Sequence, residues 1–385
     1  MMQDDSSDTW ADDAARTTGP QWPVLKPGIE RCRVGSSTVL TSDGQIHLAL
    51  EEHEVAMLDD FDGTRDCTEL SERHGAGVGE LVHDLAAAGF LAGTPPFVAP
   101  SVVVSKDGIE FSGFDRVVAV IDSAIGAHLA RRTTLVAAGV AAVCGLAVLF
   151  NAPSGDASYS ATVTLAVLAV WAIVCAIPHE VAHALVLHRA GRRVGRVGFG
   201  MHWGAVCFFV DATDALFLPR RVRLAQTLAG PFADAVIAGC LALIAWAIGP
   251  GPGAALLLQV AGLNWMSVLF NLSPLLELDG QRALEDMLDE PDLHRSSLAA
   301  ITQVRKVHDR RTRFLAVYGL AAVVVGVVAL LTSARFWADH YLPVVEQSLD
   351  EGVAGQMVAL VFVGPTAAAL VVWLVHRVMG LRRLG

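Results

Sequence analysis

Charged residues are scarce in this chain. Of its 385 residues only 17% are Asp, Glu, Lys or Arg, whereas 53% are hydrophobic, and the mean hydropathy is +0.49. These proportions exclude an ordinary soluble enzyme and indicate a membrane core plus one small domain. The charge balance gives no reason to predict nucleic-acid binding, because the net charge is −11 and the basic residues stand beside hydrophobic segments.

Two further absences concern the compartment. The six cysteines form no CxxC pair and no repeated spacing, so we expect them to be reduced and mostly buried, in agreement with a cytoplasm-facing protein. The N-terminal segment is acidic, is rich in Ser and Thr, and has no apolar stretch of the kind found in signal peptides. We therefore expect no cleaved signal peptide.

Long apolar segments, by contrast, are abundant. Those long enough to cross about 30 Å of hydrocarbon run over residues 133–151, 160–187, 225–248, 254–275, 314–333 and 354–376. The connections after the first, third and fifth segments hold one basic residue, Arg335, whereas the connections on the other side are rich in Arg. Positive charge marks the cytoplasmic side. We therefore predict a multi-pass protein of the cytoplasmic membrane, with six transmembrane helices and both termini in the cytoplasm.

The second apolar segment ends in the sequence HEVAH at 179–183. On a helix, an HExxH motif places two imidazoles one turn apart on the same face, where they can share a zinc ion beside the intervening Glu. No charged residue occurs over 161–178, so these polar groups would lie within or just under a bilayer, where they are costly unless they serve a function. At about 1.5 Å per residue, His183 lies roughly 9 Å and His179 roughly 15 Å from the cytoplasmic end at Arg189.

A catalytic zinc site needs a third protein ligand besides two His. The fourth apolar segment ends in NLSPLLELDG at 271–280, where we expect Pro274 to disturb the helix and Gly280 to let the backbone turn sharply after Asp279. This segment also runs toward the cytoplasm, so Asp279 comes to the depth of the HEVAH motif and completes a His, His, Asp set. Glu277 is the competing carboxylate, and Asp279 as a plain helix-ending residue is the alternative.

HEVAH at 179–183, AGP at 229–231 and NLSPLLELDG at 271–280 together resemble the site-2 protease family of intramembrane metalloproteases, over roughly residues 133–300. The resemblance implies one Zn2+ per chain, with ligands His179, His183 and Asp279, general base Glu180, and Asn271 helping to hold substrate or the oxyanion. Asn264 and Asn271 as plain links between helices are the alternative, and Asn264 is the less expected to touch the site. One departure is Asp234, which stands where such proteins often carry Asn and leaves a polar role for this position open.

Residues 23–95 have a different character and follow a tail at 1–22 that we expect to be disordered. Alternating apolar residues around turn signals at 35–36 and 43–44 predict a short antiparallel sheet, and helical patterns follow at 50–60, 66–74 and 78–90. This order predicts a small α+β, winged-helix-like domain. The stretches LDDFDGTRDCTEL and VGELVHDLAAAGFL resemble the PqqD-like leader-recognition domain of peptide natural-product pathways, which implies that a precursor's leader binds along a strand edge.

Two shorter regions connect these parts. We expect residues 96–132 to form a linker, with a short strand pair and an amphipathic helix that leads into the membrane domain at 133–385. Glycines and short apolar runs at 195–218 predict a β-hairpin beside the site. An edge of that hairpin could hold a substrate in extended form by strand addition.

The whole pattern predicts a mainly α, polytopic membrane protein with a small α+β N-terminal domain. The expected activity is that of a zinc metallopeptidase that cleaves the leader from a ribosomally synthesised peptide precursor. Its expected partners are that precursor, the lipid bilayer, and peptide-modifying enzymes or an exporter. Two alternatives stay open: regulated intramembrane proteolysis of a transmembrane signalling protein, and a membrane scaffold or export and immunity factor with a vestigial metal site.

Overall fold

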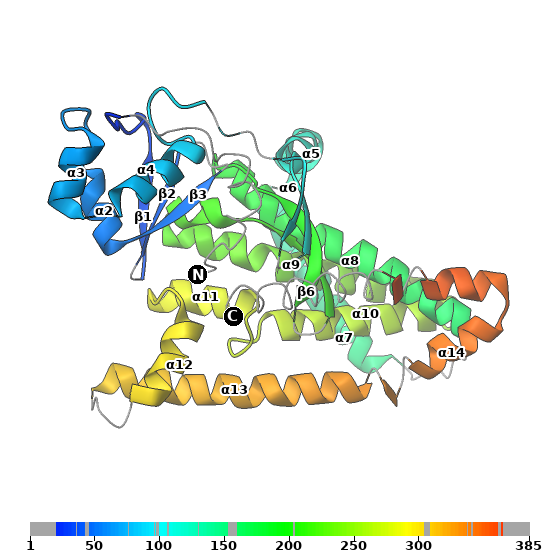
Figure 1. Ribbon diagram of the computed structural model, residues 1–385. Coiled ribbons are helices and arrows are strands. Elements are labelled where there is room, and N and C mark those ends of the chain that lie inside the picture. The colour runs from blue at the N-terminus through cyan, green and yellow to red at the C-terminus, as the bar shows by residue number, and fades with distance from the viewer. Residues whose placement is uncertain are drawn as a thin grey trace.

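The computed structural model describes residues 21–35, 37–42, 46–75, 77–95, 97, 100–105, 108–129, 131–152, 160–202, 205–303, 309–336, 338–339, 342–360 and 363–364. Figure 1 shows a small sheet-and-helix unit at the N-terminal end, a second sheet, and a group of long helices. The N-terminal unit below means residues 21–95, and the helical unit means residues 131–364. Nearly all of the expected disordered tail at 1–22, and most of the expected span at 354–376, lie outside the described residues.

Four helices in the described part are long and apolar enough to cross a membrane, which indicates a membrane protein. They are α7 (Arg132–Asn151), α9 (Arg220–Ile248), α10 (Pro252–Asn271) and α13 (Arg310–Phe336, apolar over Arg310–Thr332). They correspond to the first, third, fourth and fifth expected spans. The second expected span forms the continuous helix α8 (Ala161–Arg189), which runs through Pro178. Four of the six expected spans are thus helices long and apolar enough to cross a membrane, and six spans stay a prediction.

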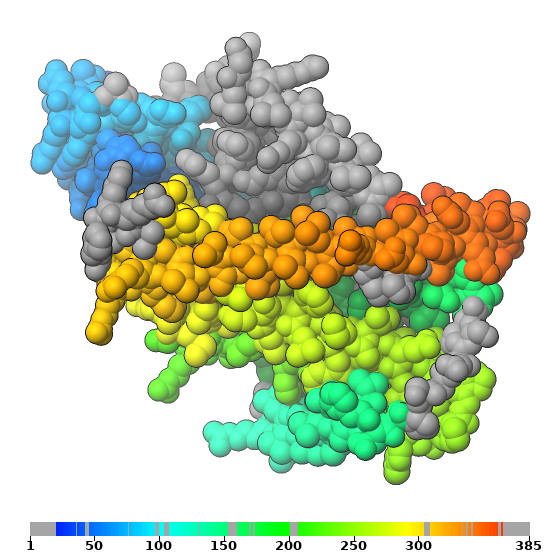
Figure 2. All heavy atoms as spheres, turned by 90° about the horizontal axis from the view of Figure 1, so that it is seen from below, coloured from blue at the N-terminus to red at the C-terminus, as the bar shows by residue number. Residues whose placement is uncertain are grey.

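The long helices carry large apolar side chains on their outer surfaces. In Figure 2, α13 runs as a long ridge across the face in view, and Val317, Leu320 and Leu331 on this helix are largely exposed. Phe150 on α7 and Trp246 on α9 are exposed in the same way. Apolar surface of this extent marks contact with lipid or with another protein, as expected for helices that face a bilayer.

Helix α9 lies at the centre of the helical unit. It packs against α7, α8, α10 and the short helix α11 (Asp279–Leu288). Farther along the chain, α12 (Leu293–Gln303) packs on α13, and α14 (Leu342–Asp350) packs on α8. Helix α10 ends at Asn271, three residues before Pro274, so the expected break near this proline is present. The chain then turns through an irregular segment into α11.

The N-terminal unit contains the expected antiparallel sheet and three helices. The strands are β1 (Glu30–Val34), β2 (Ser37–Thr41) and β3 (His47–Glu51), and the helices are α2 (Glu52–Leu58), α3 (Cys67–His74) and α4 (Val78–Ala87). Asp66 begins α3 by accepting hydrogen bonds from the backbone N–H groups of Thr68 and Glu69. Leu40 and Leu50 on one face of the sheet join the core formed by the helices. Assignment to the winged-helix class stays a prediction.

The second sheet combines two distant pieces of the chain. Its strands, in spatial order, are β4 (Val102–Ser105), β5 (Gly108–Phe111), β6 (Val197–His202) and β7 (Ala205–Val210), all antiparallel. The expected strand pair and the expected hairpin both form, and β7 packs against α8. Helix α5 (Phe114–Ile121) continues through a π-helical turn, η1 (Asp122–Gly126), and α6 (Ala127–Leu129) toward α7. The salt bridge from Arg189 to Asp122, 2.8 Å long, fixes this turn to the end of α8.

Candidate metal centre

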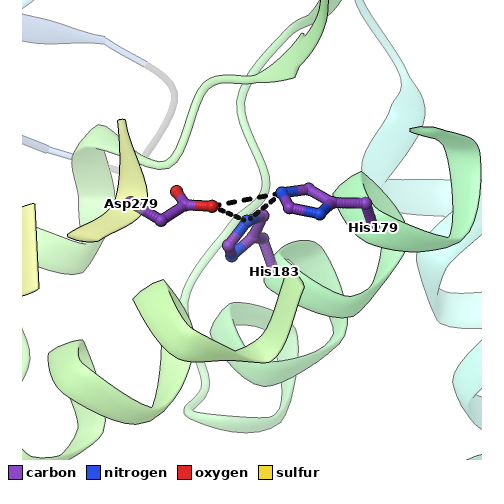
Figure 3. A group of neighbouring side chains, drawn as sticks. All are labelled: His179, His183 and Asp279. Carbon is purple, nitrogen blue, oxygen red and sulfur yellow. Dashed lines mark hydrogen bonds and ion pairs between the residues drawn. The ribbon is translucent and has the colours of Figure 1, made fainter. Parts of the chain in front are cut away.

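Three side chains from two helices converge on one point (Figure 3). His179 and His183 lie one turn apart on α8, and Asp279 is the first residue of α11. The two Nε2 atoms are 3.1 Å apart, and Oδ2 of Asp279 is 3.2 Å from Nε2 of His179 and 3.4 Å from Nε2 of His183. The structure therefore brings together the His, His, Asp set that the sequence predicts.

The spacing of these atoms matches that of ligands around one metal ion. Nitrogen and oxygen atoms that surround a tetrahedral ion at about 2.0–2.1 Å lie about 3.3 Å from one another, close to the three distances above. Both imidazoles are buried, and Asp279 is partly buried. An ionised carboxylate beside two imidazoles could hold a metal ion.

Hydrogen bonds on the far side of each ring orient both imidazoles toward this point. Nδ1 of His183 donates to the carbonyl oxygen of Gln226 at 2.7 Å, and Nδ1 of His179 donates to Oδ2 of Asp234 at 2.8 Å. A carbonyl or carboxylate oxygen can only accept, so the proton of each neutral ring sits on Nδ1. Each Nε2 then presents a lone pair toward Asp279. Such partners typically accompany metal-ligating His.

Asp234 therefore has the polar role that the sequence leaves open. Its side chain is only 2% exposed, and Asn264 on α10 donates to its backbone oxygen at 2.7 Å. Asn264, which we did not expect to touch the site, thus supports the residue that orients His179. Position 234 lies four residues after Gly230, and residues four apart share a helix face. That spacing is the signal in the sequence that indicates this role.

Gly230, in the AGP sequence, lets α9 pass directly against both imidazoles. A methyl group at this position would lie 2.3 Å from Nε2 of His183 and 2.5 Å from Nε2 of His179. These distances are shorter than any real carbon contact, and the methyl group would take the space in front of both nitrogen lone pairs. A residue without a side chain is therefore required here.

Gly280 has a different role from the one expected. Its backbone is helical within α11, so it does not make a sharp turn after Asp279. A methyl group at Gly280 would lie 2.3 Å from the backbone oxygen of Leu272 and 2.7 Å from that of Ser273. The glycine is needed because the start of α11 packs directly on the chain leaving α10. This close packing brings Asp279 to the imidazoles.

Of the other predicted residues, Glu180 lies nearest to the group. It stands between the two His on α8 and is partly buried. Its carboxyl group therefore belongs to the same helix turn as both imidazoles, where a base for a nearby water would act.

Asn271 and Glu277 do not join the group. Asn271 ends α10, and its Nδ2 donates to Oγ of Ser267 at 3.4 Å; the described hydrogen bonds do not connect it to a candidate ligand. Glu277, the competing carboxylate, lies 3.4 Å from Nε2 of His294 and is not a member of the metal group found in the described residues. Within the described part of the chain, Asp279 is therefore the carboxylate that lies beside both Nε2 atoms.

Comparison of the chain with known proteins finds no matching family model, no matching curated protein and no matching solved structure. The similarity to site-2 proteases and to leader-recognition domains therefore rests on the sequence motifs, and the activity it implies is a proposal.

Proposed function

We propose that this chain is a zinc endopeptidase of the site-2 protease type, embedded in the cytoplasmic membrane with its site facing the cytoplasm. The convergence of His179, His183 and Asp279, whose ligand atoms all lie within 4.8 Å of one another, carries the proposal. Two imidazoles and one carboxylate, with a fourth position left for water, form a donor set typical of catalytic zinc. The positive-inside distribution of Arg supports the orientation, with both termini in the cytoplasm.

The chemistry is peptide hydrolysis. When bound, zinc lowers the pKa of a water molecule toward about 7 and polarises the scissile carbonyl. Glu180 takes a proton from the attacking water, whose oxygen bonds to the carbonyl carbon. As the C–N bond breaks, Glu180 passes that proton to the amine nitrogen, so that one carboxyl end and one amine end result. The bonds from His179 to Asp234 and from His183 to Gln226 keep both rings in one orientation throughout.

The proposed substrate is the precursor of a ribosomally made peptide. Three strands followed by three helices in the N-terminal unit support this choice, together with the PqqD-like sequence pattern. In our proposal the leader adds as a strand to this small sheet, and the segment beyond it reaches the metal in extended form beside β7. An extended backbone exposes the carbonyl that a helix shields. The released core peptide would leave at the membrane, where modifying enzymes or an exporter can receive it.

One expression experiment tests the activity and the substrate class. The full chain is produced together with precursor peptides encoded beside its gene, and products are compared by mass spectrometry for the wild type, Glu180→Gln and the control Glu277→Gln. We expect a truncated peptide with the wild type and with Glu277→Gln, none with Glu180→Gln, and one zinc per chain in all three. Wild-type protein that binds no zinc would contradict the proposal. Cleavage of a transmembrane protein, with no cleavage of a soluble precursor, would contradict the proposed peptide substrate and favour a transmembrane signalling protein instead.

A further inference from the structure

The small sheet of the N-terminal unit is partly covered on each face, and Glu30, Ala49 and Glu51 on the face away from its core are exposed. Leu40 and Leu50 point into the unit's own core, whereas the opposite face carries Glu30, Thr41 and His47, which the strand register places side by side. Thr41, in the middle of that row, is only 1% exposed. The segment of the helical unit between α8 and α9 packs on this face, because Glu30 and His47 both bond to residues of that segment.

A chain of charged groups crosses this interface. The guanidinium of Arg192 donates to both carboxylate oxygens of Glu30, at 2.8 and 2.6 Å. Its Nη1 also lies 3.8 Å from Oδ1 of Asp214, and the same oxygen lies 3.4 Å from Nε2 of His47. Arg192 and Asp214 of the helical unit thus stand between Glu30 and His47 of the N-terminal unit. The side chain of Asp214 is only 3% exposed and that of Arg192 19%, whereas that of Glu30 is half-exposed, so the network is shielded from solvent at its Asp214 end.

An aromatic ring and a thiol complete the contact. Phe217 stacks against the imidazole of His47, with ring centroids 6.2 Å apart, and the guanidinium carbon of Arg192 lies 5.4 Å from the centre of the same ring. Sγ of Cys32 donates to the backbone oxygen of Leu216 at 3.2 Å. A shielded cation–π contact beside a bidentate ion pair defines one geometry rather than a loose association.

The segment that receives the sheet is directly continuous with the metal centre. Arg192 follows the end of α8, which carries His179 and His183. Asp214 lies in the 3-10 turn η2 (Thr213–Phe217), which immediately precedes α9 with its Asp234. Helix α8 connects Arg192 with the two His, and α9 connects the turn of Asp214 with Asp234. The N-terminal sheet is therefore held at one position relative to the metal ligands.

We propose that the N-terminal unit stays docked during catalysis, and that Glu30, His47, Arg192 and Asp214 determine where along the precursor the cut falls. This inference rests on the proposed function. A leader strand adds at a strand edge of this sheet, because an edge presents unpaired backbone N–H and C=O groups. An extended chain advances about 3.3 Å per residue, so a constant span from that edge to the metal selects one peptide bond.

Charge reversal across the interface tests this inference in the full-length protein. Arg192→Glu and Glu30→Arg each place like charges together, whereas the double variant restores an opposite pair. We expect each single variant to keep its zinc but to cut at several positions, or at least ten times more slowly at the wild-type position. The double variant should recover the single cut in part, because an opposite pair forms again with position 30 while the carboxylate now at position 192 faces Asp214. Arg31→Ala, on the same strand but bonded to Asp59 within the N-terminal unit, should behave like the wild type.

A covalent lock tests permanent docking without disturbing the network. Leu216→Cys brings a second thiol beside Cys32, and a short bifunctional maleimide can then join the two units. Because the proposal has the units docked throughout turnover, the cross-linked protein should keep the wild-type cut position and rate. Loss of cleavage on cross-linking, or an unchanged single cut at the wild-type rate in Arg192→Glu, would overturn the inference.

Hydrogen exchange separates this inference from the proposed function. Amide exchange in residues 30–34 and 213–217 should rise in Arg192→Glu and fall back toward the wild-type level in the double variant. If the wild type cleaves no precursor, the proposed function fails and the role in choosing the cut position fails with it. The exchange experiment still tests whether the N-terminal unit is docked. Unchanged protection of both segments in Arg192→Glu would contradict docking through this pair.

Discussion

His179 on α8 and Asp234 on α9 are joined by a hydrogen bond of 2.8 Å from Nδ1 to Oδ2, and both side chains are buried. The bond connects the HEVAH helix to the central helix of the bundle. It also leaves Nε2 of His179 bare, in the direction of Asp279. A carboxylate in this place orients the ring and makes its nitrogen a stronger donor toward a metal ion.

We therefore expect Asp234→Ala to weaken zinc binding by about 10–100-fold, the range typical of partners that orient metal-ligating His. Asp234→Asn should be intermediate, because its amide oxygen still accepts from Nδ1 but carries no charge. Zinc affinity is measured by competition with a chelator on protein in detergent. Asn271→Ala serves as the control and should bind zinc like the wild type. Equal affinity for wild type and Asp234→Ala would show that this carboxylate does not support the site.

Gly230 yields a steric prediction. In Gly230→Ala the new methyl group would stand 2.3 and 2.5 Å from the two Nε2 atoms, so α9 or both rings must move. We expect the purified protein to contain little or no zinc. Gly262→Ala on α10 is the matched control, because a methyl group there meets no atom within 4 Å. Full zinc content in Gly230→Ala would mean that α9 does not lie where the structure places it.

The position of Asp279 depends on how α11 is attached to α9. Nε of Arg223 on α9 donates to Oδ1 of Asp286 on α11 at 2.6 Å, and both side chains are mostly shielded from solvent. Asp286→Asn should destabilise the protein by about 1–2 kcal/mol, more than loss of an exposed ion pair costs.

Zinc affinity should fall in the same variant, because α11 carries Asp279. Thermal unfolding in detergent and chelator competition measure the two effects. The control is Arg311→Ala, which removes an ion pair with Glu290 at the surface. If zinc affinity falls no more in Asp286→Asn than in this control, the salt bridge does not position Asp279.

The N-terminal unit should lose stability in acid through Asp60. A hydrogen bond with His74, followed by the charges of Arg73 and Arg65, holds the pKa of this carboxyl below its usual value. A carboxyl whose pKa is lowered by folding contributes stability above its unfolded pKa of about 3.9, and this contribution disappears as the pH falls through the folded value.

In Asp60→Asn, the amide protons of α3 should therefore exchange faster than in the wild type at pH 7. This difference in exchange rate should vanish near pH 2. Hydrogen exchange corrected for the intrinsic rate at each pH measures it. Asp59→Asn is the neighbouring control, since Asp59 pairs only with exposed Arg31 among the described ion pairs. A difference that persists unchanged at low pH would assign the effect to another group.

Much of the architecture follows from local patterns in the sequence. Uninterrupted apolar runs predict α7, α9, α10 and α13, because a spanning helix needs only length and hydrophobicity. The HExxH spacing puts two imidazoles on one face of α8, because residues four apart are neighbours on any helix. Alternation around turn signals predicts the sheet of the N-terminal unit, and glycines with short apolar runs predict the hairpin of β6 and β7.

Only the tertiary structure decided the contacts between segments that lie far apart in the chain. The support of His179 by Asp234, the close approach of Gly230 to both rings, and the packing of Gly280 on Leu272 depend on how α8, α9, α10 and α11 pack. The same holds for the joining of β5 to β6 and for the contact between His47 and Asp214. Periodicity reports which face of an element is apolar. It does not specify which distant backbone or polar group will meet that face, because that choice comes from the packing of the whole chain.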